Sequence, residues 1–113
     1  MKIIKTQATD IAQTPHKVAV RKLFSFDHAT FVHITLESGE TLLPHITPVD
    51  ATFYILEGKG KVEIGDEIEQ VSKGDLVFSP ANIKHRLKNS REESFSFLVI
   101  KTPTPKNQKT IIL

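Results

Sequence analysis

The stretch "GETLLPHITPVDATFYILEG", residues 39–58, carries the pattern that decides the fold. Its second half, rich in β-branched and aromatic residues and ending at Gly58, predicts a strand. Its first half holds one histidine, His45, in an apolar setting flanked by prolines. A second stretch, "GDLVFSPANIKHRLKN", residues 74–89, holds His85. The fold decides whether these two histidines meet in one site.

The rest of the chain also consists of short strand patterns separated by turns. Residues 28–40 alternate, with Val32, Ile34 and Leu36 on one face. Residues 61–71 predict a hairpin whose two-residue loop, Gly65-Asp66, starts with the glycine that a type II′ turn needs. Evenly spaced antiparallel strands close into a barrel or pack as two sheets, so we expect an all-β fold.

Helical patterning is confined to the N-terminal region. Residues 3–13 show helix-like spacing, and Pro15 limits them to a short or irregular piece. Toward the C-terminus, Lys101, Lys106 and Lys109 form the only local excess of charge, which we interpret as a solvated tail.

Composition narrows the class of protein. The chain has 113 residues, enough for one domain, with 39% hydrophobic and 25% charged residues. The cysteine count is 0, which rules out disulfides and thiolate metal sites. No apolar run approaches the ~20 residues of a membrane span, and the start does not resemble a signal peptide. The formal charge of +2 is scattered. We therefore expect a cytoplasmic protein that binds neither nucleic acid nor membrane.

The two quoted stretches resemble the two signature motifs of the cupin superfamily, and in particular its small single-domain conserved-barrel (cupin 2-like) members. Residues that match the motifs are Gly39, His45 and Gly58 in the first and Gly74, Pro80, His85 and Asn89 in the second. Asn82 stands where the family has an inner glycine, a mild change because both residues tolerate a left-handed backbone.

The resemblance implies a jelly-roll β-barrel (double-stranded β-helix) of short antiparallel strands, with a pocket open at one end. It implies a single cupin domain over residues 1–113, with motif one at 39–58 and motif two at 74–89. We expect the tail, residues 102–113, to be extended, because its alternate prolines hold polyproline-like angles.

In this family, two histidines and a glutamate of motif one and the histidine of motif two hold a divalent metal. The resemblance therefore implies a metal site at His45 and His85, for Zn, Fe, Ni or Mn. The second histidine of motif one is replaced by Thr47, and the glutamate position is Ala51. The weaker candidates for further ligands are Asp50, Thr47 and His33. Occupancy by a metal is accordingly doubtful.

Three hypotheses about function follow. The first is a small-molecule-binding cupin with a degenerate metal site, whose pocket surrounds His45 and His85. The alternative is a metal-dependent cupin enzyme of dioxygenase, isomerase or lyase type that uses both histidines and a third ligand. The last is a partner-binding domain with a plugged barrel. No nucleophile–base pair is recognisable, so catalytic residues stay unknown, and His16 and His28 are expected to be exposed.

We also expect a homodimer, because symmetric pairs are the commonest oligomers and small cupins resemble this pattern. The segments expected to exchange or pair at sheet edges are "KVAVRKL", residues 17–23, and "TIIL", residues 110–113. The second of these could equally fold back on its own chain.

Overall fold

The structure is a computed structural model that describes residues 1–106 and 111–113. A short 3₁₀ helix, η1, precedes the strands. The bounds are η1 Thr6–Ala8, β1 Ile11–Ala12, β2 Ala19–Phe26, β3 Ala29–Leu36, β4 His45–Ile46, β5 Asp50–Glu57, β6 Lys59–Ile64, β7 Glu67–Ser72, β8 Leu76–Ser79, β9 Lys84–Lys88, β10 Phe95–Thr102 and β11 Ile111–Ile112. The region with helix-like spacing holds this short 3₁₀ helix and the two-residue strand β1, so it is as short and irregular as Pro15 predicted.

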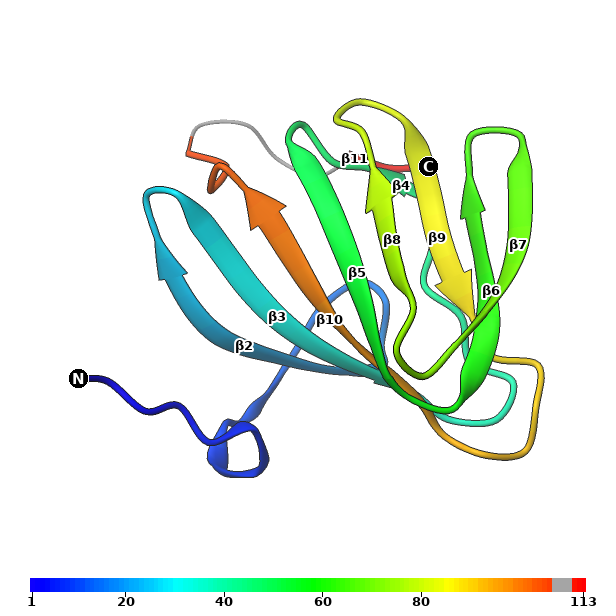
Figure 1. Cartoon of the computed structure of the whole chain (residues 1–113), viewed down its shortest axis with the longest axis horizontal. Coiled ribbons are helices and arrows are strands. Elements are labelled where there is room, and N and C mark those ends of the chain that lie inside the picture. Colours follow the sequence, from blue (N-terminus) through cyan, green and yellow to red (C-terminus); the bar gives the residue numbers. More distant parts are fainter. Residues whose placement is uncertain (107–110) are drawn as a thin grey trace.

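The strands of the described residues form two antiparallel sheets, which confirms the expected all-β class. The six-stranded sheet has the order β1-β2-β3-β10-β5-β8, and the five-stranded sheet has the order β11-β4-β9-β6-β7. In Figure 1 the first sheet spreads across the left and centre, and β4, β9, β6 and β7 lie to the right. Neighbours distant in sequence, such as β3 and β10, are paired along seven residues, so the sheets wind around a common core.

The alternation predicted for residues 28–40 is confirmed, because Val32, Ile34 and Leu36 are buried in the core. The predicted hairpin is confirmed as well. Ile64 pairs with Glu67, which leaves Gly65 and Asp66 as the loop. Gly65 has a φ of 57°, the positive value that the first position of a type II′ turn requires.

One end of the barrel is closed by tightly packed side chains. Leu36, Ile55, Leu87 and Phe95 are all 0% exposed. Asn89, the last residue of motif two, is buried there as well. Its side-chain amide donates to the carbonyls of Leu36 and Glu93, and its oxygen accepts from the Arg91 N–H. This motif residue therefore ties three backbone segments together.

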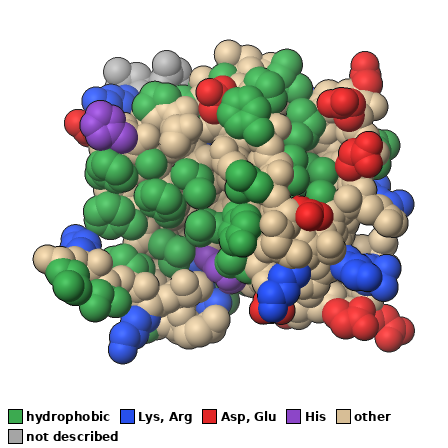
Figure 2. All heavy atoms as spheres, in the orientation of Figure 1, with side chains coloured by type: hydrophobic (Ala, Val, Ile, Leu, Met, Phe, Trp, Pro, Cys, Tyr) green, Lys and Arg blue, Asp and Glu red, His purple; other side chains and the backbone are tan. Residues whose placement is uncertain are grey.

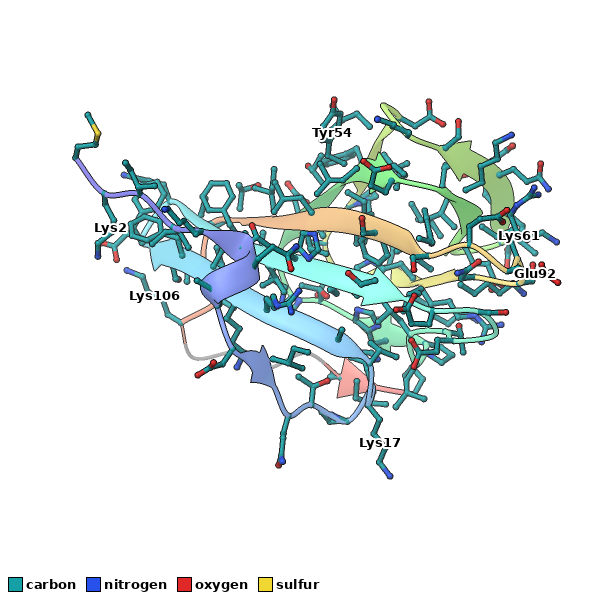
Figure 3. All side chains as sticks on the ribbon, turned by 90° about the horizontal axis from the view of Figure 1, so that it is seen from below. Lys2, Lys17, Tyr54, Lys61, Glu92 and Lys106 are labelled. Atoms are coloured by element: carbon teal, nitrogen blue, oxygen red, sulfur yellow. The ribbon has the colours of Figure 1, made fainter. Side chains whose placement is uncertain are left out.

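The outer face of the six-stranded sheet is apolar and exposed. Tyr54, Leu76 and Phe78 are 40%, 67% and 59% exposed, and Figure 3 shows Tyr54 standing away from the sheet. Figure 2 shows hydrophobic side chains gathered over β3, β10 and β5. Contiguous apolar surface of this kind marks contact sites in other proteins. The homodimer stays a prediction, since a single chain does not test it.

Of the two segments expected at sheet edges, the first is not at an edge, whereas β11 is an edge strand of the five-stranded sheet. β2 is an inner strand between β1 and β3. β11 folds back and pairs with β4 of the same chain, through Ile111–Ile46 and Ile112–His45. Residues 107–110, which belong to the tail expected to be extended and include Lys109, lie outside the described residues. Among the described residues, no helix is long and apolar enough to cross a membrane.

Candidate functional site

The other end of the barrel is hollow. A cavity of about 320 Å³ opens between the two sheets, within the range of small-molecule pockets. Its walls are mainly apolar and include Val20, Val32, Ile34, Phe53 and Val99. Its polar lining comes from histidines, lysines and hydroxyl groups, namely Thr14, His16, Lys22, His45, Thr47, His85 and Lys101.

Strand pairing brings the two motif histidines together. His45 on β4 lies directly opposite His85 on β9 in the antiparallel register, so both side chains point to the same face of the sheet. Their Nε2 atoms are 3.0 Å apart. Only 8% of His45 and 2% of His85 is exposed. Sequence positions forty residues apart thus form one buried pair.

The hydrogen bonds around the pair fix the tautomer of each ring. His45 Nδ1 lies 2.7 Å from the Leu43 carbonyl, which only accepts, so Nδ1 carries the proton and Nε2 accepts. His85 Nε2–H therefore donates to His45 Nε2, and His85 Nδ1 accepts from the Ser79 hydroxyl at 2.8 Å. The result is a one-way chain of donors through two neutral imidazoles, from Ser79 to Leu43.

Burial keeps these imidazoles neutral. It lowers the pKa of His45, although the hydrogen bond to the Leu43 carbonyl opposes the effect. The pKa of His85 falls to about 3, first through burial and then through the positive charges that His45, Lys101 and His16 can carry. Protonating His85 would also break the chain, because its Nδ1 accepts from Ser79.

His16, expected to be exposed, lines the cavity instead. Its Nδ1 accepts a hydrogen bond of 2.8 Å from the Leu43 N–H, and its ring lies 5.0 Å from that of His45 in an edge arrangement. Burial and the neighbouring His45 lower its pKa to about 4. It precedes the strands of both motifs, so no spacing pattern in the sequence pointed to it. His28 is exposed, as predicted.

Lys101 is a second residue whose place differs from the prediction. It was assigned to a solvated tail, but it lies on β10 and lines the cavity. The signal was present in the sequence, since Lys101 continues the inward alternation of Phe95, Phe97 and Val99. Lys22 reaches the cavity from β2 in the same way, two residues after Val20.

The weaker ligand candidates are scattered. The Thr47 hydroxyl lies 3.3 Å from His85 Nε2, beside the pair. Asp50 Oδ1 accepts from the Ala81 N–H at 2.8 Å, which fastens the turn between β8 and β9. His33 alternates with Val32 and Ile34 on β3, so it faces the outer side of the sheet. Its pKa is lowered by burial and by Arg21.

The donor set of the cavity is small for a resident metal ion. Proteins usually hold zinc with three or four side chains. Among the described residues, no group of three or more His, Cys, Asp or Glu side chains is placed to hold a metal. The His45–His85 pair offers two imidazoles, and both are engaged in hydrogen bonds with protein partners. The pair alone does not fit a tightly held metal.

Comparison with known proteins identifies the fold and the family. A family model described as "Cupin domain" matches residues 32–101. An uncharacterized protein of Methanocaldococcus jannaschii, MJ0764, is 30% identical over 88 residues, which are 77% of this chain and 76% of that protein. This relative carries no assigned activity in its name.

Solved structures agree. The crystal structure of TT1209 from Thermus thermophilus superposes with a TM-score of 0.79 and 26% identity, over 93% of this chain and 100% of that one. An uncharacterized Klebsiella pneumoniae protein with a double-stranded β-helix domain superposes with a TM-score of 0.83 and 16% identity, over 99% and 96% of the two chains. The expected jelly-roll architecture is confirmed.

Proposed function

The chain belongs to the cupin family, and we propose that it binds a small molecule in the cavity around His45 and His85 without needing a resident metal ion. One observation carries this proposal. The hydrogen-bond chain from Ser79 to Leu43 satisfies both buried imidazoles, while about 320 Å³ of space lies beside them. The apolar walls and few polar groups suit a small organic ligand.

Ligand screening by NMR in the presence of EDTA tests the proposal. We expect some small aromatic or aliphatic compounds to bind saturably and to shift the amide signals of Thr47, Ala51 and His85. Ala51→Leu should abolish this binding, because Ala51 is 1% exposed and lines the cavity, so a larger side chain fills it. His28→Ala is the matched control, since His28 is exposed elsewhere. Binding that EDTA removes and Zn²⁺ restores would overturn the proposal.

A metal-dependent enzyme is the second candidate. The observation that favours it is the approach of His45 Nε2 and His85 Nε2 to 3.0 Å, since adjacent imidazoles are common metal ligands. Against it, the Asp50 carboxylate accepts a hydrogen bond from the Ala81 N–H, and His33 faces away from the cavity. Metal content of protein purified without added metal decides this question. A near-stoichiometric metal lost in His45→Ala would favour the enzyme.

The third candidate, a partner-binding domain with a filled barrel, predicts no cavity of ligand size. The hollow end argues against it.

A further inference from the structure

The cavity has a one-sided charge. Two lysines line it, Lys22 and Lys101, and none of the described residues that line it is an aspartate or a glutamate. The three histidines add hydrogen-bonding groups but no negative charge. Any ligand that enters therefore meets ammonium groups and no carboxylate, and this distribution selects for the charge of the ligand.

Lys101 is the more informative of the two lysines. It is half-buried, and burial and the nearby Lys22 lower its pKa. It lines the cavity and lies on the same face of β10 as Phe97 and Val99, and its charge also depresses the pKa of His16, His45 and His85. Among residues 1–106 and 111–113, neither Lys101 nor Lys22 has an ion-pair partner. A partly buried cation without a counter-ion is unfavourable, and an anion in the cavity would relieve that cost.

His16 supplies a further donor. Its Nδ1 accepts from the Leu43 N–H, so the neutral ring carries its proton on Nε2. No described residue accepts a hydrogen bond from that nitrogen. An N–H donor beside two ammonium groups is suited to the oxygens of a carboxylate.

The cavity walls require the ligand to have an apolar part as well as a negative charge. Val20, Val32, Phe53 and Val99 present apolar surface, and the His45–His85 pair already satisfies its own hydrogen bonds. A fully polar anion would leave those walls unused. Resting on the proposed function, we propose that the ligand is a small organic anion, with its carboxylate at Lys101, Lys22 and His16 and its apolar body against these walls.

Matched pairs of charged and uncharged probes test this inference. Benzoate and benzamide share one shape, as do hexanoate and hexanamide, and each pair differs by one charge. Titration is followed by NMR at pH 7.5 with EDTA. We expect each carboxylate to bind about tenfold or more tightly than its amide, because hydrogen bonds to an ionised group are roughly twice as strong as those between neutral groups.

Two variants locate the effect. Lys101→Met keeps the length of the side chain and removes its charge, so carboxylate binding should weaken by about tenfold while amide binding is unchanged. Lys59→Met removes the same charge from an exposed residue on β6, outside the cavity, and should change neither. The comparison of carboxylate with amide binding on the unaltered protein still tests the inference if a variant folds poorly.

Each outcome has one meaning. Equal binding of amides and carboxylates, or equal weakening by Lys59→Met and Lys101→Met, overturns the anion inference and leaves the small-molecule cavity standing. If uncharged compounds of the wider screen bind and neither carboxylate does, the anion inference is also overturned and the small-molecule cavity still stands. Absence of any binding in the cavity, by charged or uncharged compounds, overturns the proposed function itself.

Discussion

The two ends of this barrel are made by the same strands and differ in what those strands place inside. β10 shows the change along one face. Phe95 and Phe97 are 0% exposed and Val99 is 5% exposed, whereas Lys101 lines the cavity. Alternation sends all four side chains inward. One end is therefore a packed core, and the other is a cavity whose mainly apolar walls carry a few polar groups.

The signature residues divide between these ends. Gly58 and Asn89 serve the closed end, where Gly58 lies against Ser94 and Asn89 joins backbone segments. His45 and His85 serve the cavity. A change at the positions that the family resemblance assigns to metal ligands, such as Thr47 or Ala51, therefore leaves these closed-end residues in place. This separation explains how the fold persists while the site diverges.

The largest expected effect contrasts the two ends of β10. Phe97→Ala should lower the free energy of unfolding by about 3–5 kcal/mol, because it opens a void in a tightly packed core. Lys101→Met, on the same face, should change that energy by less than about 1 kcal/mol, since it removes a cation without a partner and keeps the side-chain volume. Urea unfolding measures both. Equal losses would show that the hollow end also carries the stability of the fold.

A pair of glycines sharpens the comparison next. Gly58 and Gly39 both have a φ of 81°, so alanine at either position is strained by roughly 1–2 kcal/mol. At Gly58 an added Cβ would also meet the Ser94 carbonyl oxygen, whereas at Gly39 it meets nothing within 4 Å. Gly58→Ala should therefore lose roughly 1–3 kcal/mol more.

Thermal and urea unfolding of the two glycine variants give the difference directly. Similar losses would mean that the backbone at Ser94, just before β10, moves easily to make room for the added Cβ. Backbone strain alone would then explain the glycine at position 58.

The closed end was largely predictable from the sequence. Period-two alternation identified the inward face of β3, and the glycines identified the turns. These are local signals, because the side-chain direction on a strand follows from its position. The loop of the β6–β7 hairpin, which begins with Gly65, is also recognised from a local signal. The order of the strands was implied only by the family resemblance.

The cavity was predictable only in part. The motifs named His45 and His85, but His16 and Lys101 were assigned to solvent. His16 reaches the site from the segment before β2, which no repeating pattern describes. Lys101 was grouped with later lysines by charge, although its position on β10 determines its direction. Long-range pairing, such as His45 with His85 across β4 and β9, decides which polar residues meet.

Within the open end, Ser79→Ala tests the hydrogen-bond chain. Ser79 is 0% exposed and donates to His85 Nδ1. Removing the hydroxyl leaves a buried acceptor unsatisfied, so stability should fall by roughly 1–3 kcal/mol. Ser90→Ala is the control, because Ser90 is exposed. NMR of the ring nitrogens should show a changed signal for His85 Nδ1, which loses its donor, while Nε2 keeps its proton because it still donates to His45 Nε2. An unchanged His85 Nδ1 signal with unchanged stability would contradict the chain.

A pH dependence follows from the same rings. The pKa of His16 is lowered to about 4 and that of His85 to about 3, from 6.5 in the unfolded chain. Their contribution to the free energy of unfolding is therefore fully present above pH 6.5. It is lost as the pH drops, because the unfolded state then binds protons that the folded state does not. Each such histidine contributes a slope of at most ~1.4 kcal/mol per pH unit.

Urea unfolding between pH 7 and pH 5 measures this slope, which should decrease in His16→Phe. His28→Ala, at an exposed position, should leave it as it is. Stability that is constant over this range would show that the cavity accommodates protonated rings, and would remove the reason for treating the pair as neutral.

The smallest expected effect concerns Asn82, which replaces the inner glycine of motif two. Its φ is 66°, and its N–H donates to the Thr47 carbonyl, so the turn before β9 keeps the left-handed backbone of the family. Asn82→Gly should change stability by less than ~0.5 kcal/mol, whereas Asn82→Ala should cost roughly 1 kcal/mol. Because this turn leads to His85, ligand binding should be unchanged in Asn82→Gly. A large loss of binding in that variant would show that the Asn82 side chain contributes to ligand binding, and does not serve only to hold the backbone of the turn.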